Sequence, residues 1–178
     1  MSLPNFLSIS RIILVIPILV FLEQKTFLYY YLALVFFVLA SLTDFLDGYL
    51  ARKNNQSSSL GALLDLLADK LLVTLVLLWL LKLYPTLSFA IPVAIIVARE
   101  LVISTVRQFI AENKNLFSLK AEFLGKSKTF LQLIAISCLI VSPNLSNNFF
   151  IFSLSLFWIS SALSLYSLLN YLKRWNLF

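Results

Sequence analysis

Apolar segments long enough to cross a bilayer follow one another along almost the whole of this 178-residue chain. A transmembrane helix needs about 20 predominantly apolar residues. The segments that approach or meet this length cover residues 6–22, 27–50, 60–83, 87–110, 121–141 and 149–172. Because unpaired backbone groups cannot face lipid, each segment should be an α-helix. We therefore expect an all-α integral membrane protein, in which six transmembrane helices form one bundle and a single domain over residues 1–178.

The composition leaves no room for a soluble domain. Hydrophobic residues make up 61% of the chain and charged residues 12%, against about 45–50% and 25% in soluble domains. The first segment lacks both a basic leader and a small-residue cleavage site, so we expect no cleaved signal peptide.

Rare residue types exclude several chemistries. The chain has no histidine, which excludes Ser-His-Asp triads, histidine bases and histidine-ligated zinc. Its single cysteine, Cys138, excludes an internal disulfide and CxxC sites. A metal held by side chains would therefore have oxygen ligands, as Mg²⁺, Mn²⁺ and Ca²⁺ prefer. For the net charge of +6 we expect an anionic lipid surface or an anionic substrate as partner, and no nucleic acid.

The distribution of cations predicts the orientation. Arginine and lysine are concentrated in the second and fourth connections and at the C-terminus, whereas the opposite side carries only Lys25 and Lys82. By the positive-inside rule, we expect a multi-pass protein of the cytoplasmic membrane whose termini and even-numbered connections face the cytoplasm. Aromatic side chains near the helix ends should form interfacial belts. They belong to Tyr29, Tyr30, Tyr31, Trp79 and Trp175.

All the aspartates of the chain lie in one short stretch, as Asp44, Asp47, Asp65 and Asp69. Their spacings of three and four residues put each pair on one helical face, with Cβ atoms about 5–6 Å apart. In an antiparallel hairpin of the second and third segments, Asp47 is level with Asp65, and Asp44 is close to Asp69. We therefore expect the four carboxylates to converge.

Carboxylates at this depth need positive charge nearby. Asp44 lies about 12 Å deeper than Arg52 at the rise of an α-helix. One aspartate in a membrane helix costs about 2.5–3.5 kcal/mol, and Arg52 and Lys70 are too few to neutralise four. One or two divalent cations would do so and remain available to an anionic substrate. The alternatives are a structural polar network and an ion pathway.

Small residues accompany the aspartates. Two of the three glycines of the chain, Gly48 and Gly61, lie in this stretch, and Ala51 shares a helical face with Gly48. Glycine in a membrane helix lets another backbone or a ligand approach closely. The pattern therefore suits a planar or bulky ligand group beside the carboxylates, although helix packing alone would explain either glycine.

The segment from Asp44 to Asp69 resembles, without a gap or a substitution, the signature D-x-x-D-G-x-x-A-R-x8-G-x-x-x-D-x-x-x-D of the CDP-alcohol phosphatidyltransferases. Eight fixed residue types at about 5% each make chance agreement on the order of 10⁻¹⁰. The resemblance implies displacement of CMP from a CDP-linked lipid by the hydroxyl of an acceptor alcohol, with divalent metal bound by the motif. The family's six-helix membrane architecture agrees with the segments above, so the resemblance covers essentially the whole chain.

The resemblance also implies individual roles. The four aspartates would hold Mg²⁺ or Mn²⁺, two ions in all, and Asp69 would also be the base for the acceptor hydroxyl. An alcohol is a poor nucleophile at neutral pH, and a positioned base contributes about 10²–10⁴-fold. Without histidine, a carboxylate has to be that base. The residues expected to bind CDP-diacylglycerol are Gly48, Ala51, Arg52, Gly61, Asn5 and Ser8.

The N-terminal residues 3–11 look like those of the phosphatidylglycerophosphate synthases within this family, with Ser8 where threonine is common. Asn5, Ser8 and Arg11 recur every three residues and form a polar stripe. This stripe would face the nucleotide or, equally well, begin an amphipathic helix in the membrane interface.

A second group of charges concerns the acceptor. Arg99, Glu100 and Arg107 lie in the fourth segment, and Lys126 and Lys128 open the fifth. Several cations near a two-metal site favour an acceptor that itself carries a phosphate, because arginine binds phosphate in a bidentate fork. The alternatives are structural pairing of Arg99 with Glu100, and ordinary flanking charges for the two lysines.

Residues 98–101 and Arg107 are similar to the corresponding segment of the same synthases. We therefore expect transfer of a phosphatidyl group from CDP-diacylglycerol to sn-glycerol 3-phosphate, with membrane lipids as further partners. The alternatives are a family member that uses phosphatidylglycerol, inositol phosphate or serine and, from another class, a small cation carrier. The resemblance also allows a homodimer, although no helix face is marked for it.

Overall fold

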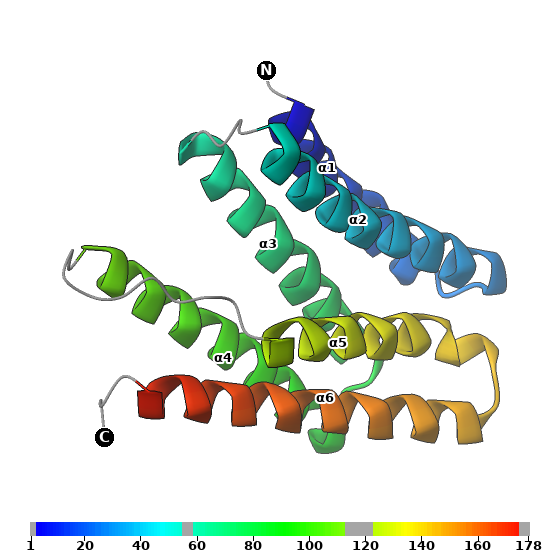
Figure 1. The fold of residues 1–178 in the computed structure, drawn as a ribbon. Coiled ribbons are helices and arrows are strands. Elements are labelled where there is room, and N and C mark those ends of the chain that lie inside the picture. The colour runs from blue at the N-terminus through cyan, green and yellow to red at the C-terminus, as the bar shows by residue number, and fades with distance from the viewer. Residues whose placement is uncertain (1–2, 55–58, 113–122, 175–178) are drawn as a thin grey trace.

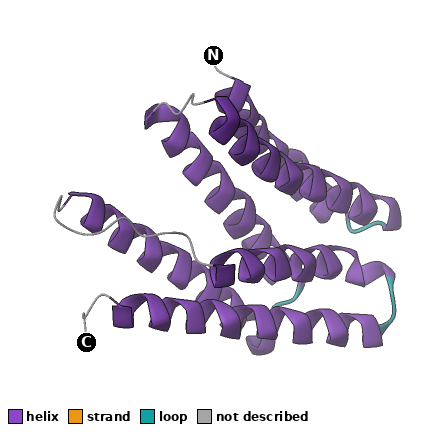
Figure 2. Ribbon diagram, viewed as in Figure 1, coloured by secondary structure: helices purple, strands orange, loops and turns teal. Residues whose placement is uncertain are grey.

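The computed structural model describes residues 3–54, 59–112 and 123–174 (Figure 1). Within these ranges the chain is helical and has no strand (Figure 2). The elements are α1 (Leu3–Gln24), α2 (Phe27–Asn54), α3 (Ser59–Leu83), α4 (Leu87–Glu112), α5 (Phe123–Val141), the 3-10 helix η1 (Ser142–Asn144) and α6 (Asn147–Arg174). Each of the six expected segments corresponds to one long helix, so the all-α class is confirmed.

Local backbone chemistry explains the short connections. Lys25 has a φ of 52° in the left-handed region and lies in the tight turn between α1 and α2. Pro85 lies two residues beyond the last residue of α3 and has no backbone N–H with which to continue the helix. Pro17 and Pro92 lie inside α1 and α4, as expected for a membrane protein whose neighbouring helices support the interrupted backbone.

The helices pack as two groups (Figure 1). In one group α1 packs along both α2 and α3, and in the other α6 packs along both α4 and α5. Contacts of α2 with α5 and of α3 with α4 join the groups. The second and third helices are antiparallel as expected, but among the described residues they touch only briefly, because α1 contacts both of them.

Rows of buried apolar side chains form these contacts between helices. Val15, Ile18 and Leu22 recur along one face of α1 and belong to the same buried cluster as Leu72 and Val76 of α3. In the second group the rings of Phe89 and Phe157 stack with centroids 5.4 Å apart. The core of the molecule therefore consists of interhelical seams.

One expectation about the aromatic residues is wrong. Tyr30 is buried, with 6% of its surface exposed, and belongs to the core cluster, so it is no belt residue. The reason is its place on the inward stripe of α2 that continues through Ala33 and Phe37. Tyr29 is half-buried and stacks on Phe21. Trp175 lies outside the described residues.

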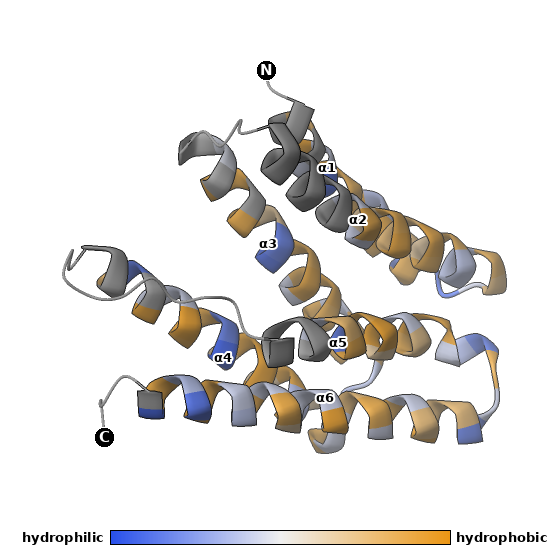
Figure 3. Ribbon diagram, viewed as in Figure 1, coloured by the Kyte–Doolittle hydropathy of each residue, from blue (hydrophilic) through white to orange (hydrophobic). Residues whose placement is uncertain are grey.

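The outer helix faces are apolar. Leu87, Phe130 and Ile16 have 80%, 67% and 64% of their surfaces exposed, and hydrophobic colour dominates the helices in Figure 3. Soluble proteins seldom expose large apolar patches. Two helical stretches in the described part of the chain, Leu87–Val106 and Asn147–Lys173, are long and apolar enough to span a membrane. Six spans remain a prediction.

Polar contacts fasten one end of the molecule, which we call the closed end. The Lys82 ammonium lies 2.7 Å from a Glu23 carboxylate oxygen and 4.8 Å from the centre of the Trp79 ring. This hydrogen bond lowers the pKa of Glu23, so the ion pair is kept at neutral pH. Further contacts there are Tyr84 Oη to Ser142 Oγ at 2.8 Å and Asn144 Nδ2 donating to the Phe27 carbonyl at 2.8 Å.

Candidate functional site

The motif lies on two helices, toward the end opposite the closed end. Asp44 and Asp47 belong to the C-terminal half of α2, and Asp65 and Asp69 to the N-terminal half of α3. Because both stretches are helical, the spacings of three and four residues place each pair on one helix face. The side chains of Asp44, Asp47 and Asp65 lie outside the described part, so the convergence of four carboxylates stays a prediction.

Asp69 is the one motif aspartate whose side chain the structure describes. It is half-buried and has an interaction partner. Asp69 precedes the buried Val73 and Val76 by four and seven residues, so it lies on the same face of α3 and nearer the motif end. A carboxylate that shares a face with a buried apolar stripe is suited to hold a cation or a proton inside the protein.

The small residues of the motif also lie within helices. Gly61 is half-buried in the first turn of α3, and Gly48 and Ala51 lie near the end of α2, as does Arg52. No glycine of the described backbone has a positive φ, so a tight turn does not explain their presence. Close approach of another group remains the physical reason. The side chains of Ala51 and Arg52 lie outside the described part.

Two residues of the N-terminal polar stripe, Ser8 and Arg11, are buried among the helices. The chain is helical from Leu3, and Ser8 is buried with 2% of its surface exposed. Arg11 is completely buried, although the sequence analysis did not select it as a site residue. This burial argues against a helix lying in the membrane interface. The side chain of Asn5 lies outside the described part.

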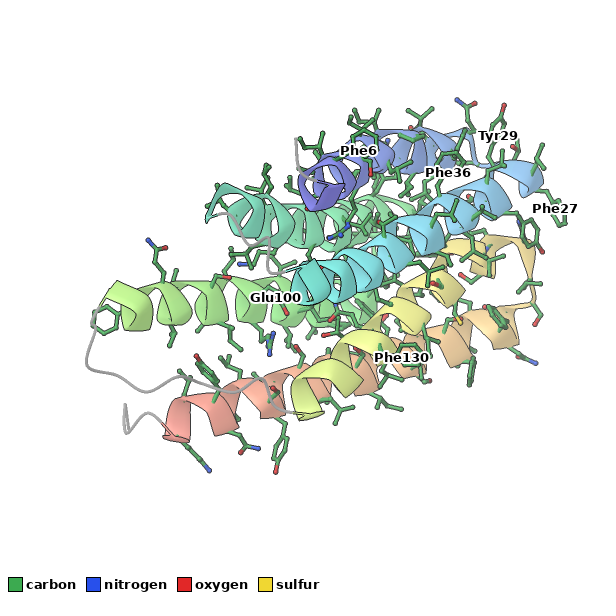
Figure 4. All side chains as sticks on the ribbon, turned by 45° about the horizontal axis from the view of Figure 1, so that its top comes forward. Phe6, Phe27, Tyr29, Phe36, Glu100 and Phe130 are labelled. Atoms are coloured by element: carbon green, nitrogen blue, oxygen red, sulfur yellow. The ribbon has the colours of Figure 1, made fainter. Side chains whose placement is uncertain are left out.

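Arg99 is buried within α4, with 6% of its surface exposed. Its Nη1 donates to Oε1 of Glu100 over 2.6 Å, as the structural alternative expected. Figure 4 labels Glu100 on α4. The Nε atom of Arg99 is also buried and has no hydrogen-bond partner among the described residues. The guanidinium therefore keeps donor capacity beyond the Glu100 pair.

Arg99 and Asp69 lie at similar depths on neighbouring antiparallel helices. Asp69 lies sixteen residues before Pro85 and Arg99 fourteen residues after it, which corresponds to roughly 24 and 21 Å along the two axes. Hydrophilic bands interrupt both α3 and α4 in Figure 3. The fold therefore places a buried cation at the depth of the motif.

The remaining predicted acceptor residues lie on the same helix group as Arg99. Arg107 is eight residues further along α4, and Lys126 and Lys128 lie in the first turns of α5. Their side chains lie outside the described part, so their meeting with Arg99 stays a prediction. Among the described residues, no cluster of three or more acidic, cysteine or histidine side chains could hold a metal ion.

Comparison with known proteins agrees with the motif. A family model described as CDP-alcohol phosphatidyltransferase matches residues 1–166. The CDP-diacylglycerol--glycerol-3-phosphate 3-phosphatidyltransferases of Escherichia coli (strain K12) and Shigella flexneri serotype 5b (strain 8401) are each 37% identical over 174 residues. These alignments cover 97% of this chain and 93% of each relative. The similarity therefore includes both helix groups.

Proposed function

Because the chain belongs to the CDP-alcohol phosphatidyltransferase family, we propose that it transfers a phosphatidyl group from CDP-diacylglycerol to sn-glycerol 3-phosphate and releases CMP. The names of the relatives that align along nearly the whole chain contain both substrates. The observation that carries the proposal is the complete eight-residue motif, present without a gap on α2 and α3.

Two Mg²⁺ or Mn²⁺ ions would be held by the motif carboxylates. The donor set fits such ions, because aspartate pairs lie on single faces of two successive helices and the chain has no histidine to favour softer metals. When bound, the ions would neutralise the diphosphate and the departing CMP phosphate. The residues proposed as ligands are Asp44, Asp47, Asp65 and Asp69.

Asp69 would take the proton of the acceptor hydroxyl. As the new bond from the hydroxyl oxygen to the phosphatidyl phosphorus forms, the bond from that phosphorus to CMP breaks and CMP leaves with its phosphate. Gly48, Ala51 and Gly61 would give the cytidine room against bare helix. Arg52 would lie by the nucleotide or the diphosphate, and the buried Ser8 supports a contribution from the N-terminal stripe, which includes Asn5.

The acceptor phosphate would be bound by Arg99, Arg107, Lys126 and Lys128. Burial of Arg99, its Nε without a partner among the described residues and its depth near that of Asp69 support this assignment. A guanidinium with donors to spare suits a phosphate oxygen, because hydrogen bonds between charged groups are the strongest in proteins.

The proposal includes the setting of the enzyme. A single domain would cross the cytoplasmic membrane six times, with the termini and the site on the cytoplasmic side, and would act there as a monomer or a homodimer. Support comes from the exposed apolar helix faces, from the two stretches long enough to span and from the distribution of cations.

The direct test is release of CMP from CDP-diacylglycerol by the purified protein in detergent. Glycerol 3-phosphate, inositol phosphate, serine and phosphatidylglycerol are supplied in parallel reactions. We expect rapid release with glycerol 3-phosphate alone and formation of phosphatidylglycerol phosphate. Faster release with another acceptor would assign the chain to a different branch of the family, and ion flux without CMP release would favour the cation carrier.

Metal dependence has its own test. Asp44→Asn, Asp47→Asn and Asp65→Asn each remove a ligand charge, and we expect each to lower kcat/KM at least about 10³-fold, or roughly 4 kcal/mol of transition-state stabilisation. EDTA should abolish turnover, and added Mg²⁺ or Mn²⁺ should restore it. A folded variant with near wild-type turnover, or full activity in EDTA, would contradict the assignment.

A further inference from the structure

Arg11 is among the largest fully buried side chains in the described part of the chain, with 0% of its surface exposed. A charged side chain inside a membrane protein is costly unless an opposite charge or a polar group accompanies it. Arg11 does have an interaction partner. The roles proposed above for the two substrates and the metals do not use it.

The position of Arg11 on α1 determines which helix it meets. Arg11 precedes Val15, Ile18 and Leu22 at spacings of four, three and four residues, so it is the next member of the buried stripe. That stripe shares a cluster with buried residues of α3. The corresponding buried stripe on α3 includes Val76 and continues toward the motif end.

The register of α1 and α3 determines how far Arg11 and Asp69 are offset from each other along the helix axes. The helices run in the same direction (Figure 1) and pack through a shared buried cluster, and the Glu23–Lys82 ion pair shows which residues are level at the closed end. Arg11 lies twelve residues before Glu23, and Asp69 lies thirteen residues before Lys82. These separations correspond to roughly 18 and 20 Å along the two axes. Arg11 and Asp69 are therefore nearly level.

Among the acids of α1 and α3, distance and charge favour this pair. Packed helix axes are about 8–10 Å apart, which an arginine side chain spans. The other acid of α3, Asp65, lies one helical turn further toward the motif end, and Glu23 already pairs with Lys82. Asp69 is half-buried and, like Arg11, has an interaction partner.

We propose that Arg11 pairs with Asp69 and acts as a positioning residue for it. The guanidinium holds one carboxylate oxygen and leaves the other directed at the reacting hydroxyl. Its positive charge also offsets part of the negative charge of the motif before substrate arrives. The pairing stands on the geometry of α1 and α3, whereas its catalytic consequence rests on the proposed function.

The first experiment measures the pairing without activity. Thermal unfolding of the full chain in detergent, with EDTA present, compares Arg11→Gln, Asp69→Asn and the double variant. Each single variant strands a buried charge and should unfold at a lower temperature, whereas the double variant should unfold no lower than the worse single one. If Arg11→Gln does not fold, recovery of folding in the double variant supports the pair. Additive losses would overturn it.

The second experiment measures the catalytic consequence. Asp69→Asn should lower kcat about 10²-fold or more while the KM for CDP-diacylglycerol stays near wild type. Arg11→Gln should lower kcat about 10-fold in the wild-type background and have no further effect in Asp69→Asn. Arg11→Lys should restore part of the loss, because it keeps the charge but lacks the fork.

The control is Lys82→Gln, which removes a cation from the closed end of α3. It should leave turnover unchanged and combine additively with Asp69→Asn. An Arg11→Gln loss of the same factor in both backgrounds, or a raised KM for CDP-diacylglycerol that persists in Asp69→Asn, would overturn the proposal, because Arg11 would then act on the lipid or on the fold. If no CMP is released at all, the proposed function fails, and the unfolding measurements still decide the pairing.

Discussion

Arg99 forms the ion pair that the sequence offered as one alternative, and it keeps a donor for the phosphate that the sequence offered as the other. It pairs with its neighbour Glu100, and its buried Nε has no partner among the described residues. A purely structural ion pair would use Arg99 to neutralise Glu100 and nothing more. A buried donor left over within a membrane protein is costly, which favours a ligand at this position.

The proposed phosphate contact of Arg99 and its pairing with Glu100 predict different kinetics. Arg99→Ala should raise the KM for glycerol 3-phosphate about 10- to 100-fold, because hydrogen bonds to charged groups contribute about 1.5–3 kcal/mol. The matched control is Glu100→Gln, which removes the carboxylate charge and keeps the guanidinium, and should change that KM much less. Equal effects of both variants on stability and KM would show that Arg99 serves only the ion pair.

Site residues can be predicted from the sequence where their spacing alone indicates a shared helix face. The motif aspartates were identified by intervals of three and four residues, and the structure places them on helices as those intervals require. Arg11 stood in the same printed sequence, but its importance depends on burial against α3. The sequence offered two signals for it, the polar spacing with Asn5 and Ser8 and the apolar spacing with Val15, and neither specifies a partner on α3.

At the scale of elements, helix boundaries were well predicted and helix partners less so. Apolar length and turn residues such as Pro85 locate each helix within a few residues. The partners depend on which stripe meets which, and all six helices are too rich in leucine, isoleucine and phenylalanine to mark a single face. The expected α2–α3 hairpin therefore gave the correct directions, but it missed α1 as the helix that packs along both.

The ring contact between α4 and α6 and a hydrogen bond at the closed end predict which of two substitutions lowers the free energy of unfolding more. Phe157→Ala removes a fully buried ring that stacks on Phe89, and we expect a loss of more than about 1 kcal/mol, below the roughly 3–5 kcal/mol of soluble cores because lipid is as apolar as the core. Tyr84→Phe removes the hydroxyl contact with Ser142 Oγ at 2.8 Å and a long hydrogen bond to the Leu139 carbonyl at 3.5 Å. We expect a loss of about 0.6 kcal/mol, because the second bond is at the limit of hydrogen-bond length. Reversible unfolding in mixed micelles measures both, and a larger loss for Tyr84→Phe would contradict this ordering.

The whole molecule is fastened at one end and carries its motif toward the other. Figure 4 shows Phe6 at the motif end of α1 and Phe27 at the opposite end, where α2 begins. The polar contacts of the closed end lie at or beside the connections between α1 and α2, α3 and α4, and α5 and α6, whereas the motif lies on the parts of α2 and α3 nearest residues 55–58. Length and hydropathy predicted six helices, but they do not determine how two groups of three diverge.

The topology predicts which connections an impermeant reagent reaches. In a Cys138→Ser background, cysteines at Ser58 or Asn115 should resist an impermeant maleimide in intact cells, because the positive-inside rule predicts that the cation-rich connections face the cytoplasm. Matched positions on the other side are Thr86 and Asn147, whose side chains are exposed; cysteines there should react in intact cells. All four should react once the membrane is permeabilised. Labelling of Ser58→Cys and Asn115→Cys from outside would reverse the orientation, and would place the motif away from the glycerol 3-phosphate of the cytoplasm.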